Sequence, residues 1–133
     1  METIKTKDCL FRNGTIISYI GKDANVVIPS EIGGMEVTKI GDVAFFATET
    51  IKRVVIPDSV TEIGYAAFQH CNSLVSIKMP KNTVVEIDES AFDDCENLTC
   101  LTPFVAETMD EWLFFDCVKL KKVPMQRIKK ERS

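Results

Sequence analysis

The stretch Ile56-Pro-Asp-Ser-Val-Thr-Glu-Ile-Gly-Tyr-Ala-Ala-Phe-Gln-His-Cys-Asn-Ser-Leu74 decides the fold, because its pattern recurs along the chain. Residues 51–57 match residues 74–80, so the apolar positions and the proline repeat with a spacing of 23 residues. A copy one residue shorter begins at Leu98, and a fading copy occupies residues 120–124. A fixed period of roughly 20 to 50 residues is typical of repeat proteins.

A second phrase lies between these copies and repeats with the same period. Residues 37–45 match residues 60–68, and the phrase returns at 84–92 and 106–114. Cysteine closes the phrase at Cys71, Cys95 and Cys117. Each repeat therefore contains two short, β-branched, alternating segments that read as strands, joined by an Ala-Phe-x-x-Cys corner and a proline corner. The pattern predicts a coil with two strands in every turn.

One turn of such a coil cannot bury its own apolar side, so neighbouring turns must stack. We expect the inward positions Ile63, Phe68, Leu74 and Ile77 to pack on their equivalents above and below. Equivalent strands should lie roughly 4.8 Å apart in a parallel ladder. The number of copies predicts about four turns, and the coil should be right-handed.

The repeated pattern Ile-Pro-x-x-Val-x-x-Ile-Gly-x-x-Ala-Phe-x-x-Cys-x-x-Leu resembles the bacterial leucine-rich-repeat family of BspA type over about residues 26–124. The resemblance implies a leucine-rich-repeat right-handed solenoid of mainly short parallel strands, with turns or short helical corners at Ala-Phe. Such repeats occur in surface adhesins and in many other proteins, and a fold does not fix a function. The chain departs from the family pattern in its last turn, where Trp112 and Phe115 replace small or polar residues.

We expect a single domain over residues 1–133, with a cap at 1–25, repeats at 26–124 and a tail at 125–133. Asn13-Gly14 separates two alternating apolar segments, which is a strong hairpin signal, so a β-hairpin should close the N-terminal end. An insertion in the first turn contains Gly33-Gly34, whose freedom at positive φ favours a protruding loop.

The C-terminal end has two interpretations. Its apolar residues fit either an improvised cap or an apolar patch that meets a partner chain. These residues are Trp112, Phe114, Phe115, Met125 and Ile128.

Composition places the chain among ordinary globular proteins. It is 45% hydrophobic and 27% charged, with a net charge of −4, which excludes disordered and collagen-like chains. No apolar run is long enough to span a bilayer, and residues 1–8 are not followed by the apolar core of a secretory signal. We expect no membrane insertion and a cytoplasmic location for the chain as written, or a surface or secreted one if its N-terminus was trimmed.

The five cysteines cannot form a fully paired disulfide framework, because their number is odd. The three that close the repeats should form a buried stack of small apolar side chains. A stack of parallel thiols is not a zinc site, which needs four converging ligands, although stacked cysteines about 5 Å apart are close enough for oxidation. Cys100 should be exposed and is the most plausible reactive thiol.

Catalytic chemistry is not predicted. His70 is the only histidine and occupies a variable, exposed position of the repeat. It cannot activate Cys71, because consecutive residues in a corner point apart. The glycines are scattered and form no phosphate-binding loop. We therefore predict no catalytic residue, no cofactor and no metal site.

Charge is divided between the two strands of each turn. Acidic residues precede the Ala-Phe corner, at Glu62, Glu86 and Glu107, whereas basic residues follow the cysteine. Either the charges only solvate the outer faces, or the basic strand face docks an acidic partner, as regular solenoid faces commonly do. This predicted face comprises Lys52, Arg53, Val55, Ser76, Lys78, Thr99, Thr102 and Lys122.

These observations favour a non-catalytic module that binds another protein through a strand face. The alternative is a self-associating structural unit, or a fragment of a bacterial adhesin-type array, with Trp112 and Phe115 as a possible C-terminal interface between copies. Nucleic acid is disfavoured despite the basic stretch 127–132, because the isoelectric point is near 5.0 and phosphate binding needs a dominant positive footprint.

Overall fold

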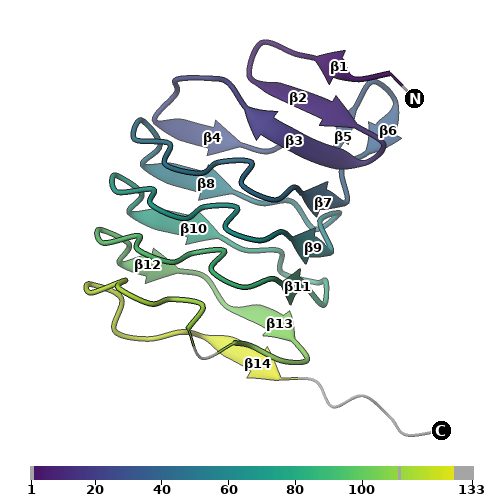
Figure 1. The fold of residues 1–133 in the computed structure, drawn as a ribbon. Coiled ribbons are helices and arrows are strands. Elements are labelled where there is room, and N and C mark those ends of the chain that lie inside the picture. Colours follow the sequence, from purple (N-terminus) through teal and green to yellow (C-terminus); the bar gives the residue numbers. More distant parts are fainter. Residues whose placement is uncertain (1, 111, 128–133) are drawn as a thin grey trace, which may run out of the picture.

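The computed structural model describes residues 2–110 and 112–127. The chain coils into a β-solenoid whose turns stack one above the next, with the N-terminal hairpin at one end (Figure 1). Two ladders of short strands run along the stack, and a layer of turns connects them. No helix occurs in the described residues, so the corners that allowed brief helices consist of turns.

Sheet 1 contains the N-terminal hairpin and the strand that precedes each Ala-Phe corner. Strands β3, β7, β9 and β11 pair in parallel, whereas β1, β2 and β3 pair antiparallel. The predicted hairpin at Asn13-Gly14 is therefore confirmed as the β2–β3 connection. The strands are β1 (Ile4–Lys5), β2 (Cys9–Arg12), β3 (Thr15–Tyr19), β7 (Lys39–Ile40), β9 (Glu62–Ile63) and β11 (Glu86–Ile87).

Sheet 2 contains the strand that follows the corner, and all its pairs are parallel. Its order is β12-β10-β8-β4. Val26, Val54, Ile77 and Leu101 lie in one register row and pack toward the core. The strands are β4 (Asn25–Val27), β8 (Arg53–Val55), β10 (Ser76–Lys78) and β12 (Cys100–Leu101).

Two further strand pairs lie outside these sheets. β5 (Glu31–Ile32) and β6 (Met35–Glu36) form a small antiparallel hairpin in the insertion of the first turn. Gly33 and Gly34 connect them at φ values of 59° and 80°, so the glycines serve the turn as expected. β13 (Phe104–Ala106) pairs in parallel with β14 (Met125–Arg127).

The solenoid has about five turns, and the prediction of about four was too low. The prediction treated β3 only as part of the cap, but β3 pairs in parallel with β7 and supplies the first rung of sheet 1. At the other end, β14 pairs with β13 and extends the stack. The number of turns was underestimated because β3 and β14 lack the full repeat pattern and were therefore not recognised as parts of repeats.

A ladder of backbone hydrogen bonds also runs through the turns. In the corners the N–H groups of one turn donate to the next turn, as Val43 does to Tyr65 at 2.8 Å and Ala66 to Glu89 at 3.1 Å. Next to the strands the N–H groups donate in both directions, as Gly64 does to Ile40 of the preceding turn at 2.8 Å and Ile56 does to Lys78 of the next turn at 2.8 Å. Each turn is therefore bonded to both neighbours, which satisfies backbone groups that the core would otherwise leave unpaired.

A column of aromatic rings runs through the core beneath the turns. Ring centroids are 5.0 Å apart for Tyr19 and Phe45, 4.8 Å for Phe45 and Phe68, 5.5 Å for Phe68 and Phe92, and 5.4 Å for Phe92 and Phe114. The predicted inward residues Ile63, Phe68, Leu74 and Ile77 are all fully buried. The stacking of equivalent side chains from turn to turn is thus confirmed.

Candidate binding surfaces

The outer face of sheet 2 brings together most of the predicted partner-binding residues. Arg53 pairs with Ser76 and Val55 pairs with Lys78, each in register between β8 and β10. These side chains alternate with buried Val54 and Ile77, so they project away from the core. Lys52 and Thr99 flank the same strands and are exposed.

Contacts on this face are few, which leaves its cations available. The Arg53 guanidinium donates to Asn25 Oδ1 at 3.4 Å. Lys52, Arg53 and Lys78 form no ion pair with any described carboxylate. Exposed cations without partners keep their hydration and can meet an incoming acidic group.

The predicted residues at the C-terminal edge of the face have different roles. Thr102 is half-buried, and its Oγ1 accepts a 2.8 Å hydrogen bond from the backbone N–H of Met79. This contact continues the ladder between turns. Lys122 is exposed and lines a shallow surface hollow beside β12, together with Lys119, Thr99 and Cys100.

Two further residues of this face were not predicted from the sequence. Asn25 and Val27 lie in the register rows of Arg53 and Val55, and Val27 is 71% exposed. The sequence does indicate both positions, because residues 25–29 match residues 53–57 in two valines and in Ile-Pro. The face therefore combines cations with an exposed apolar side chain.

The outer face of sheet 1 carries the opposite charge. Glu62 and Glu86 are in register between β9 and β11, and with Glu107 they line one surface hollow. Lys39 interrupts the acidic row, because its Nζ lies 2.9 Å from Glu62 Oε2. The hydrogen bond to Glu62 raises the pKa of the Lys39 ammonium.

The three repeat cysteines are buried, as predicted, and also act as hydrogen-bond donors. The Sγ atoms of Cys71, Cys95 and Cys117 donate to main-chain carbonyls of the preceding turn at 3.0, 3.1 and 3.0 Å. Burial raises the pKa of Cys71 to about 12. The neighbouring Cys117 side chain, together with burial, raises the pKa of Cys95. Cys100 is exposed.

His70 lies on the layer of turns and is more constrained than its variable position indicated. Its Nδ1 is 2.5 Å from Asp94 Oδ2, and its ring meets Phe46 edge-on at 5.5 Å. Cys71 points the other way, into the core, so the two side chains do not form a nucleophile and base pair. No cluster of three metal-ligating side chains occurs in residues 2–110 and 112–127.

At the C-terminal end the apolar residues divide into two groups. Leu113 is buried and Phe114 stacks on Phe92, so these two close the core. Trp112 and Phe115 are exposed and contact each other edge-on at 5.3 Å. Met125 is partly buried against the core, and Ile128 lies outside the described residues.

Comparisons with known proteins agree with this architecture. The model of the family described as BspA type leucine rich repeat region matches residues 15–131 in six copies. No curated protein matches the chain. In the described part of the chain, no helix is long and apolar enough to cross a membrane.

Three solved structures are similar to the chain. A leucine-rich repeat protein from Bacteroides capillosus is 28% identical, with a TM-score of 0.77, and the match covers 93% of this chain and 98% of that one. A Treponema pallidum leucine rich repeat protein is 34% identical over 69% of this chain, with a TM-score of 0.65. A leucine rich cell surface protein from Faecalibacterium prausnitzii is 28% identical over 95% of this chain, with a TM-score of 0.71. The matches span 44% of the Treponema chain and 43% of the Faecalibacterium chain.

Proposed function

Because the chain belongs to the BspA-type leucine-rich-repeat family, we propose that it is a non-catalytic module that binds an acidic protein partner through the outer face of sheet 2. Repeat solenoids provide extended, regular surfaces suited to protein recognition. The proposed face comprises Lys52, Arg53, Val55, Ser76, Lys78, Thr99, Thr102 and Lys122, extended by Asn25 and Val27.

The proposal rests on the basic side chains of this regular face, which are not paired with acidic side chains. Arg53 and Lys78 project from adjacent strands and have no carboxylate partner among the described residues. An acidic partner would complement these charges, which speeds association and fixes the orientation of the complex. Val27 adds exposed apolar area that a partner would bury.

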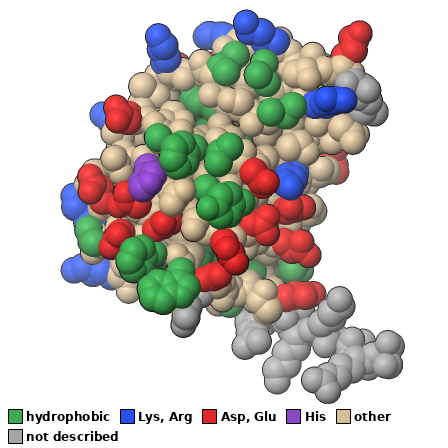
Figure 2. Space-filling model, viewed as in Figure 1, with side chains coloured by type: hydrophobic (Ala, Val, Ile, Leu, Met, Phe, Trp, Pro, Cys, Tyr) green, Lys and Arg blue, Asp and Glu red, His purple; other side chains and the backbone are tan. Residues whose placement is uncertain are grey.

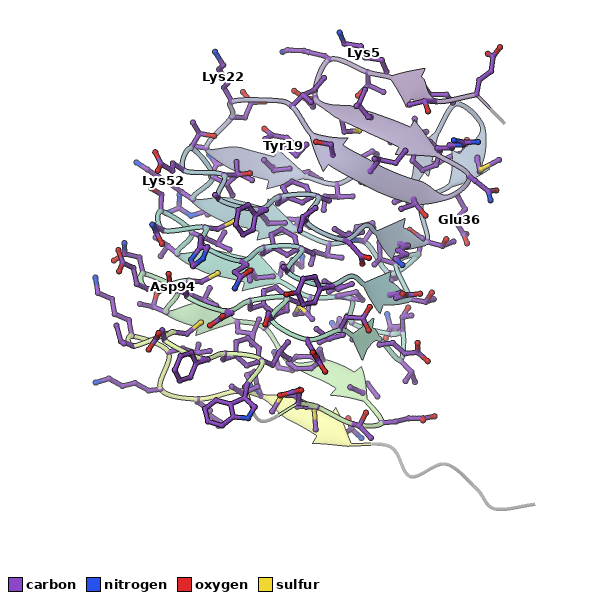
Figure 3. All side chains as sticks on the ribbon, in the orientation of Figure 1. Lys5, Tyr19, Lys22, Glu36, Lys52 and Asp94 are labelled. Carbon is purple, nitrogen blue, oxygen red and sulfur yellow. The ribbon has the colours of Figure 1, made fainter. Side chains whose placement is uncertain are left out.

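Cross-linking with a lysine-reactive reagent tests the proposal. The chain would be immobilised, used to capture a partner from the source organism, and cross-linked before mass spectrometry. We expect cross-links from Lys52, Lys78 and Lys122, and none from Lys5 and Lys22, which lie at the N-terminal cap (Figure 3). Cross-links confined to Lys5 and Lys22 would reject the sheet 2 face.

Self-association through the C-terminal end is the second candidate. Trp112 is 59% exposed and contacts Phe115, so the two rings form an apolar site at the last turn. The description of the Faecalibacterium relative as a cell surface protein supports an array or surface role. Light scattering across a tenfold concentration range, with and without reductant, tests it. A dimer that persists in reductant supports this candidate, and a monomer throughout rejects it.

A further inference from the structure

The layer of turns forms a third face of the solenoid, distinct from both sheets. This turn face comprises residues 41–50, 64–73, 88–97 and 112–118, which run in front of sheet 2 in Figure 1. None of these segments contains lysine or arginine. Their acids are Asp42, Glu49, Asp88, Glu89, Asp93, Asp94, Glu96 and Asp116.

Exposed aromatic side chains lie among these acids. Phe46, Tyr65 and Phe115 are 46%, 49% and 48% exposed, and Trp112 and Val43 are also exposed. Figure 2 views this face and shows hydrophobic side chains surrounded by acidic ones, with the histidine between them. Single exposed apolar residues are normal, but several on one face mark an interaction site.

The backbone ladder aligns these side chains in columns. Ala47 donates to Gln69, His70 to Asp93 and Asp94 to Phe115. Phe46, Gln69, Asp93 and Phe115 therefore follow one another along the stack. With roughly 4.8 Å between turns, Phe46 and Phe115 are about 14 Å apart, which is about four residues of an extended peptide.

The acids of this column and its neighbour are held in place. Gln69 Nε2 donates to Asp93 Oδ2 at 2.9 Å, and His70 contacts Asp94 at 2.5 Å. The corners are themselves bonded to the turns on either side. A partner would therefore meet a surface that is already ordered, and less conformational entropy would be lost on binding.

We propose that the turn face is a second binding surface, which takes an extended, Lys- and Arg-rich segment of a partner protein with apolar residues between its cations. Cations would pair with the acids and lie on the faces of the exposed rings in cation–π contacts. Apolar residues would cover Phe46 and Phe115. The acidic charge of the face opposes nucleic acids and anionic membranes.

Two synthetic peptides test this proposal. One has four arginines, four valines and four serines, and the other has four arginines and eight serines. Anisotropy in physiological salt should show the valine peptide binding about tenfold more tightly, because only it covers the rings. The double variant Phe46→Ala/Phe115→Ala should remove this difference while keeping the native fold, followed by circular dichroism, because about half of each ring is exposed to solvent. Equal binding of the two peptides by the native chain would overturn the proposal.

A matched pair of charge variants separates site binding from general attraction. Glu89→Gln/Asp116→Asn and Glu62→Gln/Glu86→Gln change the net charge equally, but only the first pair lies on the turn face. The first should weaken binding of the valine peptide about fivefold and the second by less than about twofold. Equal losses would overturn the proposal. A native dimer that Phe46→Ala/Phe115→Ala dissociates would also overturn it, because the face would then be an interface between copies.

Discussion

The Sγ atom of Cys71 donates a hydrogen bond to the main-chain carbonyl oxygen of Phe45 at 3.0 Å, so the cysteine of one turn is tied to the phenylalanine of the turn before it. Cys95 and Cys117 repeat this contact with Phe68 and Phe92. A repeat cysteine therefore fills space in the core and also bonds its turn to the main chain of the preceding turn.

Removing the hydrogen-bond donor of the Cys71 side chain should destabilise the chain more than replacing the thiol with another donor. Cys71→Ala removes one of the two donors to the Phe45 carbonyl, which keeps the backbone N–H of Thr48 at 3.2 Å, and the lost hydrogen bond costs about 0.5–1.5 kcal/mol. Cys71→Ser retains a donor and should cost less. Urea denaturation of both variants measures the difference. Equal losses would mean that the thiol acts by volume alone.

The buried thiol of Cys71 should also make stability fall at alkaline pH. Its pKa is raised from 9.0 to about 12 in the folded chain, so the unfolded chain loses this proton first. The stability from the protonated thiol is full below about pH 9 and declines toward pH 12, by about 1.4 kcal/mol per pH unit. Urea unfolding between pH 8 and pH 10.5 should show a shallower decline for Cys71→Ser. Identical slopes would contradict this pKa shift.

Only one thiol of the native chain should react rapidly. Cys100 is exposed, whereas Cys9, Cys71, Cys95 and Cys117 are buried, and thiol reactivity requires access. Titration with an aromatic disulfide reagent should release one fast equivalent, which Cys100→Ser removes. Five equivalents should appear in denaturant. Any fast equivalent in the native Cys100→Ser chain would contradict the prediction, because it would show that a buried cysteine is accessible.

Gly64 should be less replaceable than Gly34. A Cβ atom at Gly64 would lie 2.7 Å from the Asp42 nitrogen and 2.9 Å from the Gly41 carbonyl carbon, so the preceding turn would have to move. Gly34 has open space around it but a φ of 80°, which costs an L-residue about 1–2 kcal/mol. We expect Gly64→Ala to cost about 2–3 kcal/mol and Gly34→Ala about 1 kcal/mol. Thermal or urea unfolding checks this order, and a reversed order would contradict the close packing at Gly64.

Features that recur in every repeat could be predicted from the sequence, whereas contacts between residues that differ from one repeat to the next could not. The inward residues, both strands of each turn and the buried cysteines follow from a period of 23 residues, because stacking places equivalent positions together. The contact between His70 and Asp94 joins equivalent positions of different residue type, so no repeat motif signals it. The corner ladder uses backbone groups, which side-chain patterns do not report.

The candidate faces were predictable to different degrees. Arg53 and Lys78 were found because alternation along a strand assigns them outward. Val27 was missed because the five-residue insertion at 31–35 separates residues 25–29 from residues 53–57 by 28 positions, which breaks the spacing of 23. The turn face was not predicted, because Phe46 and Phe115 align only when the corners are stacked in three dimensions.

Calorimetry with the partner captured by cross-linking tests the central claim most directly. Arg53→Glu/Lys78→Glu reverses two charges on sheet 2, and Lys5→Glu/Lys22→Glu reverses two at the cap, so both variants carry the same net charge. We predict that the first variant weakens binding about 100-fold and that the second changes it by less than about twofold. Equal affinities of the two variants would contradict recognition through the outer face of sheet 2.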